Sequence, residues 1–90
     1  MSYLKEIVEE QRFSKDIDSF RGKYTHIDEL QEWISNTLPG NPRIGRPFKE
    51  DPELYVLTTP VLQDTPSFWV VYFFDENKIY LRSIEPVRDE

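Results

Sequence analysis

The cations of this chain that could act on a phosphate group are few and fall in two places. Three belong to one stretch of loop and two lie in or after the last apolar run: Arg43, Arg46, Lys49, Arg82 and Arg88. Fixed cations stabilise charge that builds up on a phosphate, and they also bind acidic partners. The three loop cations are followed by acids at positions 50, 51 and 53. The alternative is therefore a solvated loop whose opposite charges screen one another.

The sequence offers few residues for other kinds of catalytic chemistry. The chain has no cysteine and a single histidine, His26, which excludes thiolate chemistry, disulfides and a multi-histidine metal site within one chain. No nucleophile is near His26 in the sequence, so we interpret it as a surface or capping residue rather than a general base. No EF-hand spacing or phosphate-binding loop is present. We therefore expect no metal and no cofactor.

Length and charge restrict the function further. Ninety residues are enough for one domain with a moderate core. The net charge of −6 argues against strong general binding to nucleic acid, which depends on neutralising phosphates. No apolar run approaches the roughly 20 residues that cross a membrane, and the first residues do not resemble a signal peptide. We expect a cytoplasmic protein without membrane contact.

Two amphipathic helices are predicted in the first half of the chain. The first has apolar residues spaced by four, three and four, and the second has a similar stripe: Phe13, Ile17, Phe20 and Tyr24, then Ile27, Leu30, Ile34 and Leu38. Gly22 is expected to end the first helix in a left-handed conformation, and Thr25 and Asp28 to open the second as a capping box. The short connection predicts a helical hairpin that packs on a sheet.

The remaining elements are predicted to be strands. Residues 3–9 form a short strand, and residues 54–59 form another after a proline-rich loop at 39–53 that Ile44 and Phe48 fix to the body. Residues 68–84 read as a β-hairpin with a polar turn at 75–78, and Pro86 ends its second strand. The predicted class is α+β, with a two-helix hairpin on a three- to four-stranded antiparallel sheet.

The run Phe68–Phe74 is apolar on both of its faces, so both must be covered. If its even-numbered residues face the helices, the odd-numbered residues and part of the next strand form an apolar patch on the other side: Trp69, Val71, Phe73, Tyr80 and Ile84, with Arg82 among them. Such a patch is typical of a partner-binding surface or a homodimer interface. The alternative is that loop 39–53 or the C-terminus folds over it.

Several phrases in this order resemble the RelE/ParE superfamily of type II toxin–antitoxin toxins. They are Phe13-Ser-Lys-Asp-Ile17, Leu38-Pro-Gly-Asn-Pro42, Gly45-Arg-Pro-Phe48, Phe68-Trp-Val-Val-Tyr72 and Ile79-Tyr-Leu-Arg-Ser-Ile84. The resemblance implies two helices packed on one face of an antiparallel sheet, with functional groups on the opposite face. It also implies a toxin that cleaves ribosome-bound messenger RNA or inhibits DNA gyrase and is neutralised by an antitoxin.

The basic residues of the RNA-cleaving branch are not matched. Residues 55–59 hold no cation where that branch commonly places one, Trp69 occupies an arginine position, and Glu85 begins the stretch where a basic residue or histidine is expected. No catalytic residue is therefore transferred, and the sequence favours a protein without ribonuclease activity. Two hypotheses remain: a toxin-like component that inhibits translation or gyrase, and a catalytically inactive interaction module.

Overall fold

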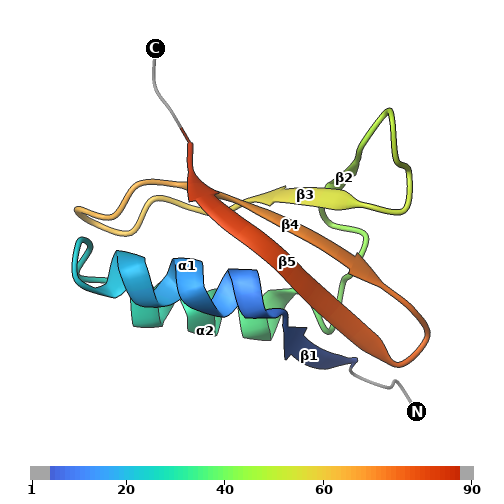
Figure 1. The fold of residues 1–90 in the computed structure, drawn as a ribbon, viewed down its shortest axis with the longest axis horizontal. Helices are drawn as coiled ribbons and strands as arrows, with labels where there is room; N and C mark the ends of the chain where they lie inside the picture. The colour runs from blue at the N-terminus through green and yellow to red at the C-terminus, as the bar shows by residue number, and fades with distance from the viewer. Residues whose placement is uncertain (1–4, 88–90) are drawn as a thin grey trace.

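A central hairpin of two long strands organises the structure. The computed structural model describes residues 5–87. Its elements are β1 (Glu6–Glu9), α1 (Gln11–Arg21), α2 (Ile27–Thr37), β2 (Arg46–Pro47), β3 (Tyr55–Thr58), β4 (Phe68–Phe74) and β5 (Lys78–Pro86). The strands form one sheet in the order β1-β5-β4-β3-β2, and both helices lie against one side of it (Figure 1). The predicted α+β class is confirmed.

The sheet differs from the expected one in strand number and direction. It has five strands rather than three or four, and it is mixed because β1 runs parallel to β5. The extra strand is β2, two residues long, which pairs with Tyr55 and Val56 of β3. Sequence patterns missed β2 because it includes Pro47, and a proline normally argues against strand pairing.

A β-bulge shifts the register of the central hairpin. Val71 pairs with Ser83, but the next residue, Tyr72, pairs with Leu81, so Arg82 has no partner of its own. The extra residue reverses the alternation of side chains along β5. As a result Ile84 turns toward the helices and is only 2% exposed. The expectation that Ile84 belongs to the opposite patch is wrong for this reason.

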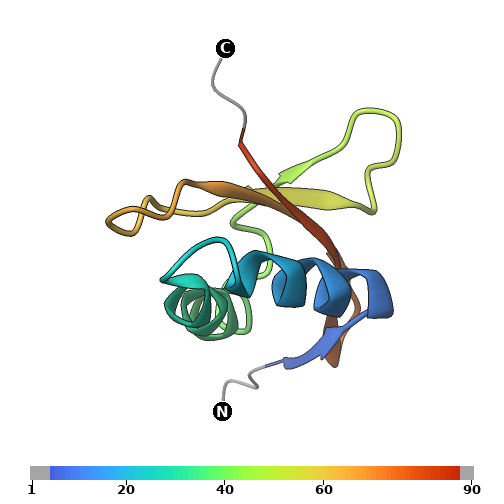
Figure 2. The same ribbon diagram turned by 60° about the vertical axis from the view of Figure 1, so that its left-hand side comes forward.

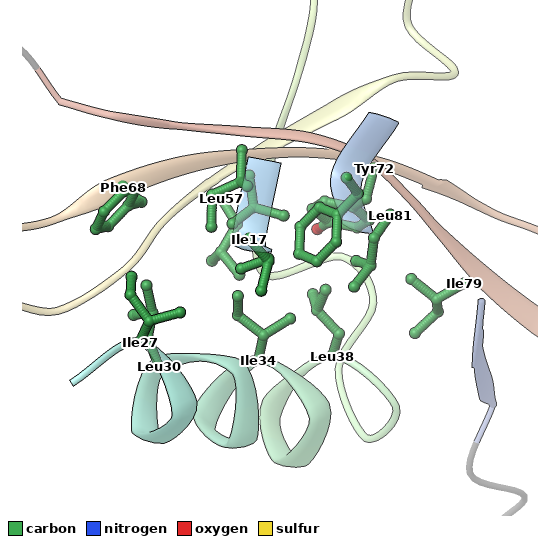
Figure 3. Close-up of a cluster of buried hydrophobic side chains, with 13 residues drawn as sticks. Ile17, Ile27, Leu30, Ile34, Leu38, Leu57, Phe68, Tyr72, Ile79 and Leu81 are labelled. Atoms are coloured by element: carbon green, nitrogen blue, oxygen red, sulfur yellow. The ribbon is translucent and has the colours of Figure 1, made fainter. Parts of the chain in front are cut away.

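The core lies between the helices and the inner side of the sheet. Both predicted helical stripes supply it, and Figure 3 shows Ile27, Leu30 and Ile34 of α2, with Leu38 just after it, projecting toward the strands. Leu57, Phe68, Tyr72 and Leu81 meet them from the sheet. None of the helices in residues 5–87 is long and apolar enough to cross a membrane.

Gly22 ends α1 as predicted, but its predicted left-handed conformation and the predicted capping box of α2 are wrong. Gly22 has φ −79°, which is right-handed, and both N–H groups that follow it, from Lys23 and Tyr24, donate to the Phe20 carbonyl. Helix α2 begins at Ile27 without a side-chain cap. Asp28 instead accepts a hydrogen bond from Arg21 Nε at 3.0 Å, so its carboxylate joins the two helices rather than capping one.

Candidate partner-binding surface

No helix of residues 5–87 covers the side of the sheet opposite α1 and α2 (Figure 2). We call this side the outer face. Cross-strand pairing places these residues on it: Arg46 of β2, Val56 and Thr58 of β3, Trp69, Val71 and Phe73 of β4, and Tyr80, Ser83 and Glu85 of β5. Arg82, which has no pair, joins them over the ring of Phe73. Four of the five residues predicted for the patch are therefore together, and the exception is Ile84. Trp69, at 37%, is the most open large apolar side chain of this face.

One end of the outer face is ordered by contacts between its own side chains. The rings of Phe73 and Tyr80 stack with centroids 4.7 Å apart and planes 13° apart. The Arg82 guanidinium lies 5.2 Å from the Phe73 ring centroid, where the cation meets the negative face of the ring. Arg82 Nε also donates to Glu10 Oε1 at 3.3 Å. This cation is therefore engaged by an aromatic ring and a carboxylate.

Part of loop 39–53 approaches the same end. Asp51, Glu53 and Leu54 line a small hollow of about 140 Å³ together with Phe73 and Arg82. Self-coverage, the alternative to a binding surface, therefore applies to the Phe73 end of the outer face. The Trp69 end, by contrast, remains exposed. The outer face thus offers a partner its Trp69 end rather than its whole length.

The predicted phosphate-binding residues do not form one cluster. Arg43 lies 5.6 Å from the ring centroid of Phe74, which is on the helix side of β4, whereas Arg82 lies over Phe73 on the outer face. Arg46 is on β2 at the edge of the sheet, and Lys49 is exposed in the loop. Arg88 lies outside the described residues. Because Arg43 and Arg82 occupy opposite faces, they cannot hold one phosphate between them.

A buried tyrosine fixes the loop that carries Arg43 and Arg46. The Tyr72 hydroxyl donates to the Pro42 carbonyl at 2.7 Å and accepts from the Gly45 N–H at 3.0 Å. Burial raises the pKa of Tyr72 above its ordinary value of 10.0, against the lowering effect of the Gly45 hydrogen bond. Ile44, which was expected to fix the loop, is instead 43% exposed. The loop is held by a polar contact that hydrophobic patterning does not reveal.

The fixed loop encloses a hollow at the edge of β3. This edge hollow measures about 520 Å³ and is lined by Trp33, Ile44, Gly45, Arg46, Val56, Leu57, Thr58 and Trp69. Its volume falls in the range of small ligand sites. Sequence reasoning missed it because the short β2 that borders it gave no strand signal.

The contacts of the single histidine, His26, are those of a capping neighbour rather than of a catalytic base. His26 Nδ1 lies 3.2 Å from Glu29 Oε1, and its backbone N–H donates to Thr65 Oγ1 at 3.3 Å. It therefore sits at the start of α2, as expected of a capping neighbour. Among residues 5–87, no three histidine, cysteine, aspartate or glutamate side chains are grouped so that they could hold a metal ion.

Comparison with known proteins adds no assignment. No protein-family model matches the chain, and no curated protein matches it either. The functional argument therefore rests on the chemistry and geometry of these surfaces.

Proposed function

We propose that this protein is an interaction module of the toxin–antitoxin type, similar to RelE/ParE toxins, which binds an antitoxin-like protein partner without cleaving RNA. The observation that carries the proposal is the outer face, where Trp69, Val71, Phe73 and Tyr80 form an apolar surface that no helix in the described part of the chain covers. Apolar patches of this kind mark protein interfaces, and exposed tryptophan is enriched among residues that dominate binding energy.

The absence of catalytic equipment on this surface supports the same proposal. Cleavage at a 2′-hydroxyl needs a proton acceptor and fixed cations around one phosphate. Among the described residues of the outer face, the cations Arg46 and Arg82 come from β2 and β5, which β3 and β4 separate, and Arg82 is already engaged by Phe73 and Glu10. His26 lies at the start of α2, beside Thr65, rather than on the sheet.

A second candidate is a working toxin that inhibits translation or DNA gyrase. The order strand, helix, helix and strands, which underlies the resemblance to RelE/ParE toxins, favours it. Gyrase inhibition needs no nuclease residues, so the missing cations do not weigh against that target. Under this candidate the antitoxin would neutralise the toxin by covering the same outer face.

Growth of a bacterial host after induced expression separates the two candidates. The chain is expressed alone and together with the product of the neighbouring gene. Normal growth with co-purification of the neighbouring product supports the interaction module, and growth arrest relieved by that product supports the toxin. Normal growth with no co-purifying neighbour would contradict both.

A further inference from the structure

The outer edge of β3 is only partly paired. β2 supplies partners for Tyr55 and Val56 and ends there. On the other side of the strand, the Thr59 N–H donates to the Phe68 carbonyl of the chain entering β4. Because successive residues of a strand direct their backbone groups to opposite sides, the N–H and C=O of Thr58 point to the open edge.

Within residues 5–87, no strand pairs with the backbone N–H and C=O of Thr58 at this edge. Ile44 is the residue that would face it if β2 continued, since Arg46 pairs with Val56 two places away. Its N–H donates instead to the Asn41 carbonyl at 3.1 Å, which turns the loop off the sheet. An unpaired edge of this kind is a template for pairing with another chain.

The edge hollow lies directly beside this open backbone position. Trp33 lines it from α2, below the sheet, while Trp69 lines it from the outer face, above the sheet. A strand laid along Thr58 would direct alternate side chains to these two sides. One side chain would therefore meet Trp33 and the next would meet Trp69. Ile44 closes the end of the hollow near β2.

The charge around the hollow indicates what kind of strand fits. Arg46 is its one charged lining residue, in a chain whose net charge is −6. A neighbouring hollow that Trp33 also lines contains Glu29 and Glu32, so the basic character is local to the Arg46 end. A segment with an acid near Arg46 and apolar residues near the tryptophans is complementary to this arrangement.

We propose that the edge hollow binds an extended acidic segment of a protein partner, which adds to the sheet as a short strand beside Thr58. This inference rests on the proposed function, because it names the chemistry of the partner's segment. The added strand is short because Pro60, the next residue pointing to this edge, has no N–H to donate. Contacts with the two tryptophans must then provide much of the affinity.

The chain contains its own reporter for this site. It has two tryptophans, and both line the edge hollow. The probe is a short capped peptide in which glutamate and isoleucine alternate. We expect it to change the tryptophan fluorescence saturably and to slow hydrogen exchange at the Thr58 amide. A peptide methylated on the backbone nitrogens that face the edge should bind about tenfold more weakly, because strand pairing is lost.

Variants at Thr58 test the backbone role directly. Thr58→Pro removes the edge N–H but leaves the bonds to β4, so binding should fall about tenfold. Thr58→Ala keeps the N–H and removes only the side chain that lines the hollow, so it should lose clearly less affinity than Thr58→Pro. Circular dichroism of each variant, with hydrogen exchange at Val70 in β4, shows whether the sheet is retained. The N-methylated peptide gives the same test on the unmodified protein if Thr58→Pro does not fold.

Three results would overturn the inference. They are an unchanged fluorescence at millimolar peptide, equal binding of the N-methylated peptide, and protection of Thr58 by a concentration-dependent dimer without any peptide. The peptide assay needs neither toxicity nor the neighbouring gene product. Peptide binding without a co-purifying partner would therefore contradict the proposed function alone. A partner that binds Thr58→Pro and the unmodified protein equally would contradict the strand addition alone.

Discussion

The hydroxyl of Tyr72 and the backbone N–H of Gly45 are 3.0 Å apart, and this hydrogen bond joins the buried centre of β4 to the loop at the edge of the sheet. The same hydroxyl donates to the Pro42 carbonyl. One buried polar atom therefore sets where Ile44 and Arg46 lie relative to β3. Through that placement, the core of the protein determines the shape of the edge hollow.

Tyr72→Phe should destabilise the protein by about 1–3 kcal/mol, because it removes both hydrogen bonds and leaves the Gly45 N–H and the Pro42 carbonyl without this partner. The measurement is urea unfolding, with the slope compared to confirm that the folded state is unchanged. Tyr55→Phe is the matched control, since Tyr55 stacks on Tyr72 but its hydroxyl has only a 3.4 Å contact with Arg43. A smaller effect of Tyr72→Phe than of Tyr55→Phe would contradict the anchoring role.

Gly45→Ala should be more harmful than an ordinary glycine substitution in a loop. A Cβ there would lie 2.7 Å from both the Tyr72 hydroxyl oxygen and the Val56 carbonyl oxygen, and the latter is backbone that cannot move aside. We expect a loss of about 1–3 kcal/mol in the free energy of unfolding. Gly22→Ala is the control: a Cβ there meets nothing within 4 Å and its φ is −79°. That variant should be neutral or more stable by up to about 1 kcal/mol, and equal losses in both would refute the clash.

The sequence predicted the elements whose signals are local. The apolar stripes of both helices and the alternating and aromatic runs of β3, β4 and β5 each lie within one segment, and Pro86 ends β5 as expected. The predicted capping box of α2 was wrong, because Asp28 has a competing partner in Arg21 on the other helix. Only the fold brings those two side chains together.

The candidate site was predictable only where strict alternation holds. Trp69, Val71, Phe73 and Tyr80 were placed on the outer face correctly because β4 alternates without an extra residue and the bulged residue of β5, Arg82, comes after Tyr80. Ile84 lies beyond the bulge at Arg82, and nothing in its sequence neighbourhood marks an extra residue. The edge hollow depends on contacts between segments far apart in sequence, Trp33 to Trp69, which no local pattern reports.

Ile84→Ala tests the bulge. An isoleucine that faces the helices and is 2% exposed should lose about 2–4 kcal/mol of stability when truncated, because the change leaves a cavity in the core. Val71→Ala, in the same hairpin but on the half-buried outer face, should lose less. Thermal or urea unfolding of both variants gives the comparison. A small loss of stability for Ile84→Ala with a large loss for Val71→Ala would contradict the bulge. It would indicate that side chains alternate along β5 without an extra residue.

The turn between β4 and β5 should make the free energy of unfolding depend on pH. Asp75 Oδ1 accepts hydrogen bonds from the N–H groups of Asn77 and Lys78, each at 2.8 Å, and these bonds lower the pKa of Asp75 below its ordinary value of 3.8. The folded state therefore binds this proton less readily than the unfolded state. The stabilisation is complete above pH 3.8 and is lost as the pH falls through the lowered pKa.

Asp75→Asn isolates this contribution because asparagine keeps the acceptor oxygen but does not titrate. Unfolding is measured for both proteins from pH 7 down to pH 2. The stability advantage of the unmodified protein over the variant should shrink below pH 3.8. A constant difference across that range would show that the Asp75 carboxylate does not contribute through its charge.

Trp69→Glu should abolish partner binding and leave the fold intact. The side chain is 37% exposed on the outer face and also lines the edge hollow, so a carboxylate there adds little strain but removes the main apolar contact of both surfaces. The change also places a negative charge near the site where an acidic segment is expected.

Binding is measured by calorimetry against the co-purified partner, and folding by hydrogen exchange in α1 and α2. Val61→Glu is the control, since Val61 is 65% exposed but is not part of the outer face. An unchanged isotherm for Trp69→Glu would remove the outer face from the binding mechanism. Equal loss in both variants would point to the added charge rather than to this surface.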